Sequence, residues 1–459
     1  MQLITNCAFL ENELLDVARL FPNRPQVVSH AFVFQDGVFF NEFTIDGENY
    51  SFKDVGQVQD ELIYKRLERR FAKLRLYEIL SEKYGKKMPW GALTGIRPTK
   101  LAYTEMERGG DYKALFNAMH VEKENIRLIE QILSSQQGIY EKKDGNTELF
   151  ISLPFCPTKC AYCSFITAPI DKTRAFIPSY LDALKRELCE SESLIGNLRG
   201  IYIGGGTPFA IEADELKKVL ESTAPIFAKN SSAEYTVEAG RPDVFTDEKL
   251  KLLQDYGVNR ICINPQTFSN ETLKKIGRKH TVEDFYKAYD MAKKYGFDVN
   301  IDLIAGLTDE SVESFVNGVE QAKNLQAENI TVHCLSLKSG AKLKEECSYI
   351  ENDEISKMIL ASREILESGG YAPYYMYRQK YQAGNNENTG WTKPHKACVY
   401  NIDVMEETTD NLAVGANAIS KRVYTGAGKI ERLGAPKDIK TYLETIDETL
   451  RKKREFFEK

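Results

Sequence analysis

The sequence lacks the features that would assign it to a membrane, an export route or nucleic acid. No apolar run in its 459 residues approaches the ~20 residues of a membrane-spanning helix. The N-terminal stretch MQLITNCAFLENELLD carries acidic residues and none of the basic residues that open a secretory signal. A net charge of −6 excludes a global positive field. We therefore expect no membrane span and no nucleic-acid partner.

The chain also lacks a disulfide framework. Three of its nine cysteines, Cys156, Cys160 and Cys163, are gathered in PFCPTKCAYCSF with C-x3-C-x2-C spacing. The others lie far apart along the chain: Cys7, Cys189, Cys262, Cys334, Cys347 and Cys398. Small secreted domains instead carry dense, regularly spaced cysteines. The pattern predicts a reducing, cytoplasmic setting.

The three gathered cysteines indicate a metal site that is one protein ligand short. A structural zinc site usually shows a second C-x2-C pair, and the sequence has none. A fully protein-ligated [4Fe–4S] cluster takes four cysteines, so three would leave one iron open to a small molecule. Tyr162 would place an aromatic ring near that iron. We favour a cluster over zinc or simple packing.

The chain falls into three predicted domains. Residues 28–52 alternate apolar and polar residues around two Asp-Gly turns, and helical patterns cover about 59–84 and 111–140. A polar linker at 142–148 ends this N-terminal α+β domain, which we place at 1–145. A core at 146–340 and a C-terminal α+β extension at 341–459 follow.

The predicted core alternates strands with helices. Its six candidate strands are ELFISLP, GIYIGG, AEYTVEAG, NRICINPQ, FDVNIDLIAGL and NITVHCLSL. Six such units predict an α/β fold, a partial (β/α)6 barrel of TIM type with parallel strands and outer helices. In such barrels chemistry sits at the carboxyl ends of the strands. The cysteine triplet directly follows the first strand.

The triplet on the first βα loop, with an aromatic residue before its last cysteine, resembles the radical S-adenosylmethionine (SAM) superfamily. The resemblance implies a [4Fe–4S] cluster held by Cys156, Cys160 and Cys163, with SAM chelating the open iron. The reduced cluster would cleave SAM to a 5′-deoxyadenosyl radical. It also implies an electron donor such as flavodoxin or ferredoxin.

Motifs at later strand ends resemble the coproporphyrinogen III oxidase-like branch of that superfamily. They are GGGTP at 204–208, VEAGRPD, INPQTF followed by an arginine, NIDLIAGL and VGANAIS. A guanidinium suits the SAM carboxylate, and an acid or amide suits ribose hydroxyls. The implied SAM-contacting residues are Tyr162, Gly205, Gly206, Thr207, Glu238, Gln266, Arg278, Asp302 and Ile419.

The segment MPWGALTGIRPTKL resembles the HemZ-type subfamily in particular, whose members are described as oxygen-independent coproporphyrinogen III oxidases. This implies a tetrapyrrole substrate, coproporphyrinogen III, whose two propionates become vinyl groups. The chain departs from the classical pattern in three places. Phe150 and Ser152 replace a tyrosine and a histidine before the cluster, and Phe165 replaces an extra cysteine.

Two other functions stay open at this stage. The first is a haem carrier of the HemW type, with His280, His333 and His395 as candidate axial ligands, although Tyr400 stands where the carrier has its haem-binding histidine. The second is a radical SAM enzyme acting on haem or another tetrapyrrole. For a porphyrinogen substrate, propionate-binding candidates are Arg378, Lys380, Lys393, Lys421 and Arg422, and ring-packing candidates are Tyr374, Tyr375, Tyr377 and Trp391.

Overall fold

A computed structural model describes residues 2–21, 24–95, 97–336, 352–379, 385–426 and 428–458 of the chain. The chain divides into two compact units. One comprises Met1–Glu130 with Arg378–Glu387, and the other comprises Gln131–Tyr377 with Asn388–Lys459. The three domain ranges predicted from the sequence stay a prediction. No helix in the described part of the chain is long and apolar enough to cross a membrane.

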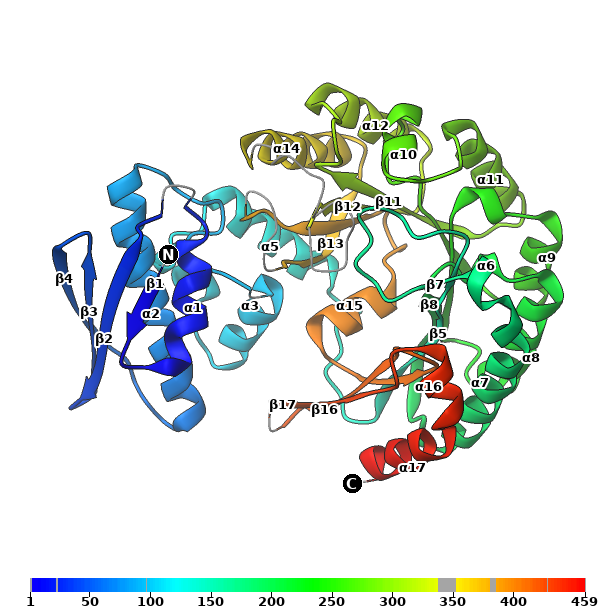
Figure 1. The fold of residues 1–459 in the computed structure, drawn as a ribbon, viewed down its shortest axis with the longest axis horizontal. Coiled ribbons are helices and arrows are strands. Elements are labelled where there is room, and N and C mark those ends of the chain that lie inside the picture. Colours follow the sequence, from blue (N-terminus) through cyan, green and yellow to red (C-terminus); the bar gives the residue numbers. More distant parts are fainter. Residues whose placement is uncertain are drawn as a thin grey trace. The chain divides into compact units, whose positions relative to one another are not determined.

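The first unit is a four-stranded sheet with helices (Figure 1). The strands β2 to β4 form the predicted meander, whose turns place Asp36 and Asp46 at positive φ. The long predicted helix is α2, which begins where Asp60 accepts a hydrogen bond from the Ile63 N–H. The elements are β1 (Gln2–Thr5), α1 (Ala8–Ala18), β2 (Val27–Gln35), β3 (Val38–Ile45), β4 (Glu48–Val55), α2 (Glu61–Tyr84), α3 (Pro98–Glu107), α4 (Tyr112–Ala118) and α5 (Lys123–Ser135). Because α5 continues past Glu130, the division between the units falls within it.

Three elements of this unit were not anticipated. The strand β1 pairs in parallel with β2, and α1 connects them. The helix α3 begins at Pro98, where a proline is tolerated because the first helical N–H needs no partner within the helix. The Arg378 segment also belongs here: its guanidinium lies over the Trp90 ring and donates to the Leu93 carbonyl, while Trp90 donates to Glu387.

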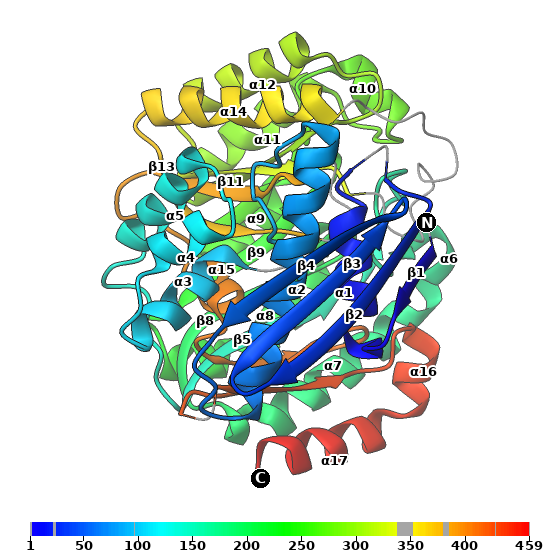
Figure 2. The same ribbon diagram turned by 90° about the vertical axis from the view of Figure 1, so that its left-hand side faces the viewer.

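The second unit contains the predicted barrel. The six predicted strands are consecutive neighbours in one sheet, in the order β5, β8, β9, β10, β11, β12, and every pair among them is parallel. Figures 1 and 2 show the sheet curving, with helices along its outer side. The elements are β5 (Asn146–Leu153), α7 (Ile177–Ser191), β8 (Asn197–Gly205), α8 (Ala213–Lys229), β9 (Glu234–Gly240), α9 (Asp247–Asp255), β10 (Arg260–Ile263), α10 (Asn270–Lys275), α11 (Val282–Lys294), β11 (Asp298–Ala305), α12 (Val312–Asn324) and β12 (Asn329–Cys334). The partial-barrel fold expected from the sequence is confirmed.

Local sequence explains why these elements begin where they do. In β11 the buried apolar residues Val299, Ile301 and Leu303 alternate with Asn300 and Asp302, so one face of this strand is apolar and the other carries polar side chains. The helices from α8 to α12 are capped at their N-termini by side chains. Glu212 and Glu215 form a reciprocal capping box on α8, and Thr281 with Asp284 does the same for α11. These caps satisfy N–H groups that would otherwise lack partners.

The C-terminal residues extend this sheet at both edges. On one side β14 pairs with β12, and β13 with β14, both antiparallel. On the other side β15 pairs in parallel with β5 and is followed by antiparallel β16 and β17. The elements are α14 (Asn352–Ser368), β13 (Ala372–Tyr377), β14 (Asn388–Thr392), α15 (Val399–Glu406), β15 (Asp410–Val414), β16 (Ile419–Tyr424), β17 (Lys429–Gly434), α16 (Ile439–Glu444) and α17 (Ile446–Phe457).

Candidate functional site

The carboxyl ends of the barrel strands bring the predicted site residues together. Parallel neighbours all end at one edge of a sheet, so the loops that follow them meet there. The Thr207 hydroxyl, after β8, donates to Cys156 Sγ at 3.7 Å. The Arg278 guanidinium, after β10, donates to the Tyr162 hydroxyl at 2.9 Å. The Gln266 N–H donates to the Asp302 carbonyl at 3.0 Å.

The cysteine loop is fixed along its length by hydrogen bonds. It starts at β6 (Phe155–Cys156), which pairs with β7 (Ala168–Pro169) before α6 (Ile170–Thr173). Within the loop the Cys163 N–H donates to the Cys160 carbonyl at 3.1 Å. The Ala161 N–H donates to the Ile276 carbonyl at 3.0 Å, which attaches the loop to the end of α10. Such fixation presents the three thiols in a defined arrangement.

Burial makes two of the three thiols, those of Cys156 and Cys163, poor anions until a metal takes the place of the proton. It raises the pKa of Cys156 to about 11, while the hydrogen bond from Thr207 acts in the opposite direction. Burial also raises the pKa of Cys163. Coordination deprotonates a thiol outright, so metal binding here releases protons. Within the described chain, no group of three or more Cys, His, Asp or Glu side chains is arranged to hold a single metal ion. A [4Fe–4S] cluster requires a different arrangement, because each thiolate binds a separate iron.

The glycine loop after β8 packs directly on the start of the cysteine loop. A Cβ at Gly206 would lie 2.5 Å from the Phe155 carbonyl oxygen, so only glycine fits. The Gly206 and Thr207 N–H groups donate to Leu153 and Phe155 at 2.9 and 2.7 Å. Gly205 has φ +108°, a conformation that side chains rarely adopt. The loop therefore approaches the cysteines as closely as its backbone allows.

Glu238 is a partly buried acid that links the glycine loop to the barrel interior. It accepts a hydrogen bond from the Tyr202 hydroxyl at 2.7 Å. Burial raises its pKa to about 7; the Tyr202 hydrogen bond lowers the pKa and the nearby Asp302 carboxylate raises it. On β11, Asp302 also lies 3.6 Å from His333 Nε2, and His333 Nδ1 lies 2.9 Å from the Tyr377 hydroxyl.

Two buried side chains at this edge keep polar atoms without a partner. Among the described residues, Gln266 Oε1 and Arg278 Nε make no hydrogen bond, although both side chains are at least nine-tenths buried. Gln266 also has a φ of 70°, an unusual value for a residue with a side chain. Buried polar atoms are normally paired, so unpaired ones point to a ligand that pairs them. A ligand with a carboxylate and hydroxyls, such as SAM, fits these groups.

The sequence reasoning missed one buried arginine at this edge. Arg241, after β9, donates to the Thr158 hydroxyl at 2.5 Å, inside the cysteine loop. It also forms two hydrogen bonds with Asp243, at 2.9 and 2.6 Å, and is 2% exposed. The signal was present in VEAGRPD, where an arginine and an acid follow Glu238. The arginine connects the third strand end to the loop that carries the cysteines.

Four further residues singled out from the sequence are either held by ordinary structural contacts or exposed to solvent. Ser152 donates to the Ala416 carbonyl at 2.8 Å, and Phe150 stacks on Tyr202. Phe165 is 69% exposed. Ile419 begins β16 and is 51% exposed; its contact with an adenosyl group stays a prediction.

The suggested ring-packing residues are mostly core residues. Trp391, Tyr374 and Tyr375 are almost fully buried, so their faces are not available to a macrocycle, and that expectation was wrong. Of the proposed propionate partners, Lys393 donates to Gln326 and Gly369, and Arg422 donates to the Phe456 carbonyl. Lys421 lies 3.5 Å from Glu407, and Lys380 lies outside the described residues.

The opposite edge of the barrel, where the strands begin, carries buried charged side chains, among which two arginines are paired with acids. Arg260, the first residue of β10, donates to Glu234, Asn300 and the Lys396 carbonyl at 3.1, 2.9 and 3.0 Å. Arg199 donates to Asp403 of α15 at 2.5 Å. Burial, and then the Asp403 carboxylate, raise the pKa of Glu148 well above its usual range. The segment 396–403 thus closes this edge.

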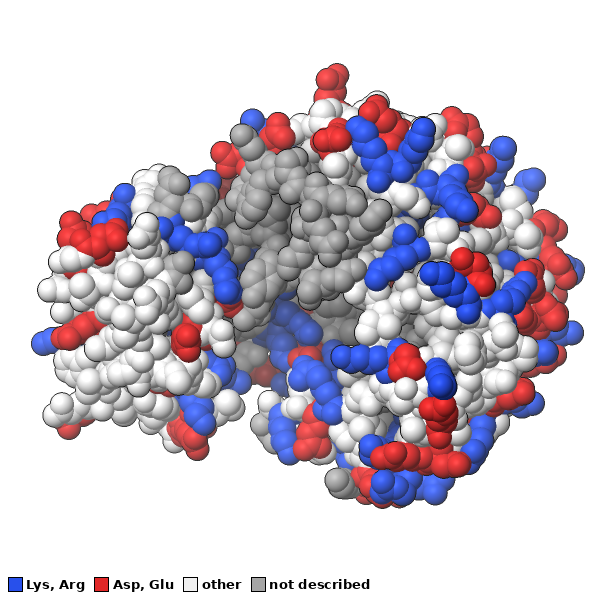
Figure 3. Space-filling model, viewed as in Figure 1, with Lys and Arg blue, Asp and Glu red and all other residues white. Residues whose placement is uncertain are grey.

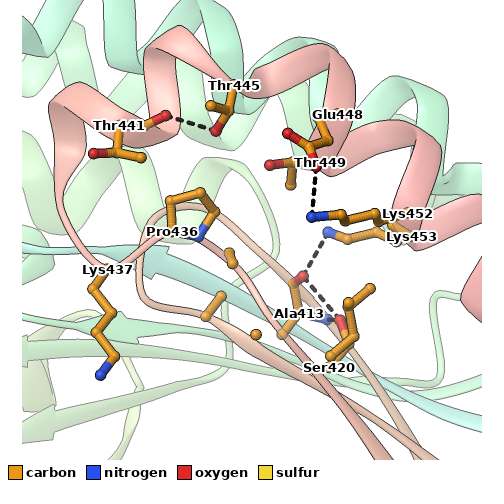
Figure 4. Close-up of a pocket in the computed structure, with 14 residues that line it drawn as sticks. Ala413, Ser420, Pro436, Lys437, Thr441, Thr445, Glu448, Thr449, Lys452 and Lys453 are labelled. Atoms are coloured by element: carbon orange, nitrogen blue, oxygen red, sulfur yellow. Dashed lines mark hydrogen bonds and ion pairs between the residues drawn. The ribbon is translucent and has the colours of Figure 1, made fainter.

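A separate cavity of about 370 Å³ lies between α16, α17 and the β15–β17 strands (Figure 4). None of its lining residues is among the predicted site residues. Two of its three lysines are paired with acids: Lys452 with Glu448 at 2.6 Å, and Lys453 with the buried Glu187. The strand-end cluster, and not this cavity, is therefore the candidate site.

Comparison with known proteins identifies the family. Residues 150–320 match the Radical SAM superfamily. The oxygen-independent coproporphyrinogen-III oxidase-like protein HemZ of Bacillus subtilis (strain 168) is 37% identical over 402 residues, which are 83% of this chain and 80% of HemZ. The heme chaperone HemW of the same organism is 34% identical over 195 residues, which are 40% of this chain and 49% of HemW.

Among solved structures, the coproporphyrinogen III oxidase HemN from Escherichia coli, described as a radical SAM enzyme, aligns with a TM-score of 0.54. The alignment covers 69% of this chain and 73% of HemN at 20% identity, so it shows a shared fold. The extent of the match to HemZ decides the assignment: the chain belongs to the radical SAM superfamily, in the oxygen-independent coproporphyrinogen-III oxidase-like family of HemZ, and the cofactors of this superfamily are a [4Fe–4S] cluster and SAM.

Proposed function

We propose that the protein is an oxygen-independent coproporphyrinogen III oxidase-type enzyme, which converts propionate side chains of a porphyrinogen to vinyl groups. The observation that carries the proposal is the group of side chains at the carboxyl ends of five neighbouring strands. Hydrogen bonds connect members of this group, which consists of the cysteine triplet, Thr207, Glu238, Gln266, Arg278 and Asp302. The similarity to HemZ, over most of both chains, supports the same function.

In this proposal each residue has one task toward the cofactors. Cys156, Cys160 and Cys163 hold three irons of the cluster and leave the fourth to SAM. Arg278 Nε and Gln266 Oε1, which lack partners in the described chain, bind polar groups of SAM. Asp302 and Glu238 accept from ribose hydroxyls, and Gly205, Gly206 and Thr207 line the methionine end. When bound, the cluster and SAM supply a 5′-deoxyadenosyl radical that abstracts a hydrogen atom.

The proposed reaction removes one hydrogen atom, one electron and CO₂ from each propionate. The hydrogen atom leaves the carbon adjacent to the ring and ends in 5′-deoxyadenosine. The electron leaves to a one-electron acceptor, such as a redox carrier protein, and the bond to the carboxylate breaks to give the vinyl group and CO₂. The protein's part is to orient the propionate and exclude water. An oxygen-sensitive cluster also suits the cytoplasmic setting expected from the cysteines.

The haem-carrier alternative rests on the similarity to HemW, which spans 40% of this chain at 34% identity for the Bacillus subtilis protein and 60% at 26% identity for the Escherichia coli protein. Tyr400, which stands where the carrier's histidine would be, lies with its ring centroid 4.2 Å from that of Tyr202. Burial raises the Tyr400 pKa well above its usual range, which disfavours a tyrosinate ligand. His280 is 3% exposed, so His333 and His395 are the more accessible axial candidates.

Anaerobic turnover tests the proposal. The reconstituted protein would be incubated with SAM, a reductant and coproporphyrinogen III that carries deuterium on the propionate carbons adjacent to the rings. We expect deuterium in 5′-deoxyadenosine, release of CO₂ and a product with vinyl groups, read by mass spectrometry.

Other outcomes separate the alternatives. SAM cleavage without label transfer or CO₂ release would reject coproporphyrinogen III and leave another tetrapyrrole, such as haem, as the substrate. Stoichiometric haem binding with no SAM-dependent turnover of either compound would establish the carrier. An inactive Arg278→Ala variant with an intact cluster is the matched negative control.

A further inference from the structure

The surface next to the cysteine loop exposes large apolar side chains. Phe165 is 69% exposed, Ile166 47% and Phe176 39%, so three large apolar side chains lie in solvent within one short stretch. The stretch is tied back to the cysteines, since β7 pairs with β6 at Cys156. Clustered exposed apolar side chains on a protein surface indicate a place where another molecule binds.

The segments that carry and adjoin these apolar side chains are rich in cations. Residues 157–176 carry Lys159, Lys172 and Arg174 against one acid, Asp171. Residues 274–280, whose Ile276 carbonyl binds the cysteine loop, add the exposed Lys274, Lys275 and Lys279 without any acid. On the face drawn in Figure 3, Lys and Arg side chains lie over α6 and α10, with acidic side chains beside them.

Part of this positive charge is not neutralised locally. Arg174 pairs with Glu212 and Glu215, and Lys275 with Glu271 and Asp309. Exposed Lys159, Lys172, Lys274 and Lys279 form no ion pair with any described residue. The whole chain carries a net charge of −6, so a basic surface at this one place opposes the overall balance. Local fields of this kind steer oppositely charged partners.

We propose that this surface, Lys159, Phe165, Ile166, Lys172, Phe176, Lys274 and Lys279, is the docking site of a small acidic one-electron carrier protein. The inference rests on the proposed function, because the carrier would deliver its electron to a cluster on the three cysteines. An apolar centre with a charged rim is the usual anatomy of a protein interface. Complementary charge mainly sets the association rate of such transient pairs. One electron passes from the carrier to the cluster, and no bond is made or broken.

The test measures cluster reduction in the full-length reconstituted protein by stopped-flow absorption near 400 nm. Reduced flavodoxin, an acidic carrier, is compared with dithionite, a small reductant that needs no docking surface. The variant Lys159→Glu/Lys274→Glu is compared with Lys218→Glu/Lys251→Glu. The control lysines are exposed on α8 and α9 and form no ion pair with any described residue. Both pairs change the net charge equally.

At low salt we expect the first variant to slow reduction by flavodoxin at least about tenfold, and the control to leave it near the wild-type rate. Dithionite should reduce all three proteins alike, and the difference with flavodoxin should shrink as salt increases. Equal slowing by both variants, or none by the first, would overturn the proposal.

The same experiment separates this inference from the proposed function. If wild type holds no cluster, or does not cleave SAM even with dithionite, the proposed function fails. If SAM cleavage with dithionite is intact and the first variant accepts electrons from flavodoxin like wild type, only the docking site fails.

Discussion

The two edges of the same parallel sheet treat buried charge in opposite ways. Where the strands begin, Arg260 gives hydrogen bonds to three partners on three segments. Where they end, the equally buried Arg278 leaves Nε unpaired, and Gln266 leaves Oε1 unpaired, among the described residues. Folding by itself supplies partners for the whole Arg260 guanidinium, whereas Arg278 and Gln266 keep hydrogen-bonding capacity for a ligand. Stability and binding are thus assigned to opposite ends of the same strands.

The largest effect should come from the cysteines. Replacing Cys156, Cys160 or Cys163 with Ala should abolish the ~400 nm absorption of a reconstituted cluster, because a thiolate ligand is lost. The apoprotein should remain folded by circular dichroism, since this edge is not where the fold is closed. Cys189→Ala, an exposed cysteine on α7, is the control. If a variant retained its full content of iron and sulfide, the replaced cysteine would not be a ligand of the cluster.

The next largest effect should come from the edge where the strands begin. Arg260→Met would leave Glu234 buried without its cation, and breaking a buried ion pair costs about 3–5 kcal/mol. Urea unfolding of the apoprotein should show that loss. Arg451→Met, which breaks an exposed pair on α17, should cost less than about 1 kcal/mol. Similar losses in both would mean that Arg260 does not hold the edge together.

At the edge where the strands end, replacing a buried arginine should lower ligand affinity more than it lowers stability. Arg278→Ala should lower SAM affinity about ten- to a hundredfold, as expected for the loss of a charge-assisted hydrogen bond. Its unfolding free energy should change less than that of Arg260→Met. Calorimetry with SAM on cluster-loaded protein measures the first quantity, and urea unfolding of the apoprotein the second. Asp302→Ala should resemble Arg278→Ala; unchanged affinity in both would reject these contacts.

The smallest effect concerns pH. Burial raises the pKa of Glu238 to about 7, so between roughly pH 4.5 and 7 the folded state binds more protons than the unfolded state. The unfolding free energy of the apoprotein should therefore fall as pH rises through this window. For Glu238 the fall should be about 1–2 kcal/mol, because part of the side chain contacts solvent.

Glu238→Gln, which carries no titrating proton, isolates this contribution. It should match wild type near pH 5 and be the more stable protein near pH 8. Thermal unfolding at both values measures the difference. Parallel curves for the two proteins would show that Glu238 does not titrate in the folded state.

The barrel was predictable because its strands and helices repeat a simple pattern. The six strands could be read from apolar runs, and parallel order then placed their carboxyl ends at one edge. The hydrogen-bond partners of the side chains at that edge could not be predicted from the sequence. Arg241 bonds to Thr158 across 83 residues, and no local pattern announces such a contact. The ring-packing prediction was wrong for Trp391 and Tyr374 because an aromatic residue in a strand fits a core as well as a ligand.

The pairing of β15 with β5 also bears on how the protein is made. Thr147, in the strand that leads to the cysteines, pairs with Asp410, more than half the chain later. Ser152, at the end of β5, likewise bonds to Ala416. A ribosome that has just released the cysteine loop has yet to synthesise these neighbours, and strand pairing over such separations forms late. Iron and sulfide delivered during translation would meet an incomplete pocket, so cluster insertion belongs to the finished polypeptide.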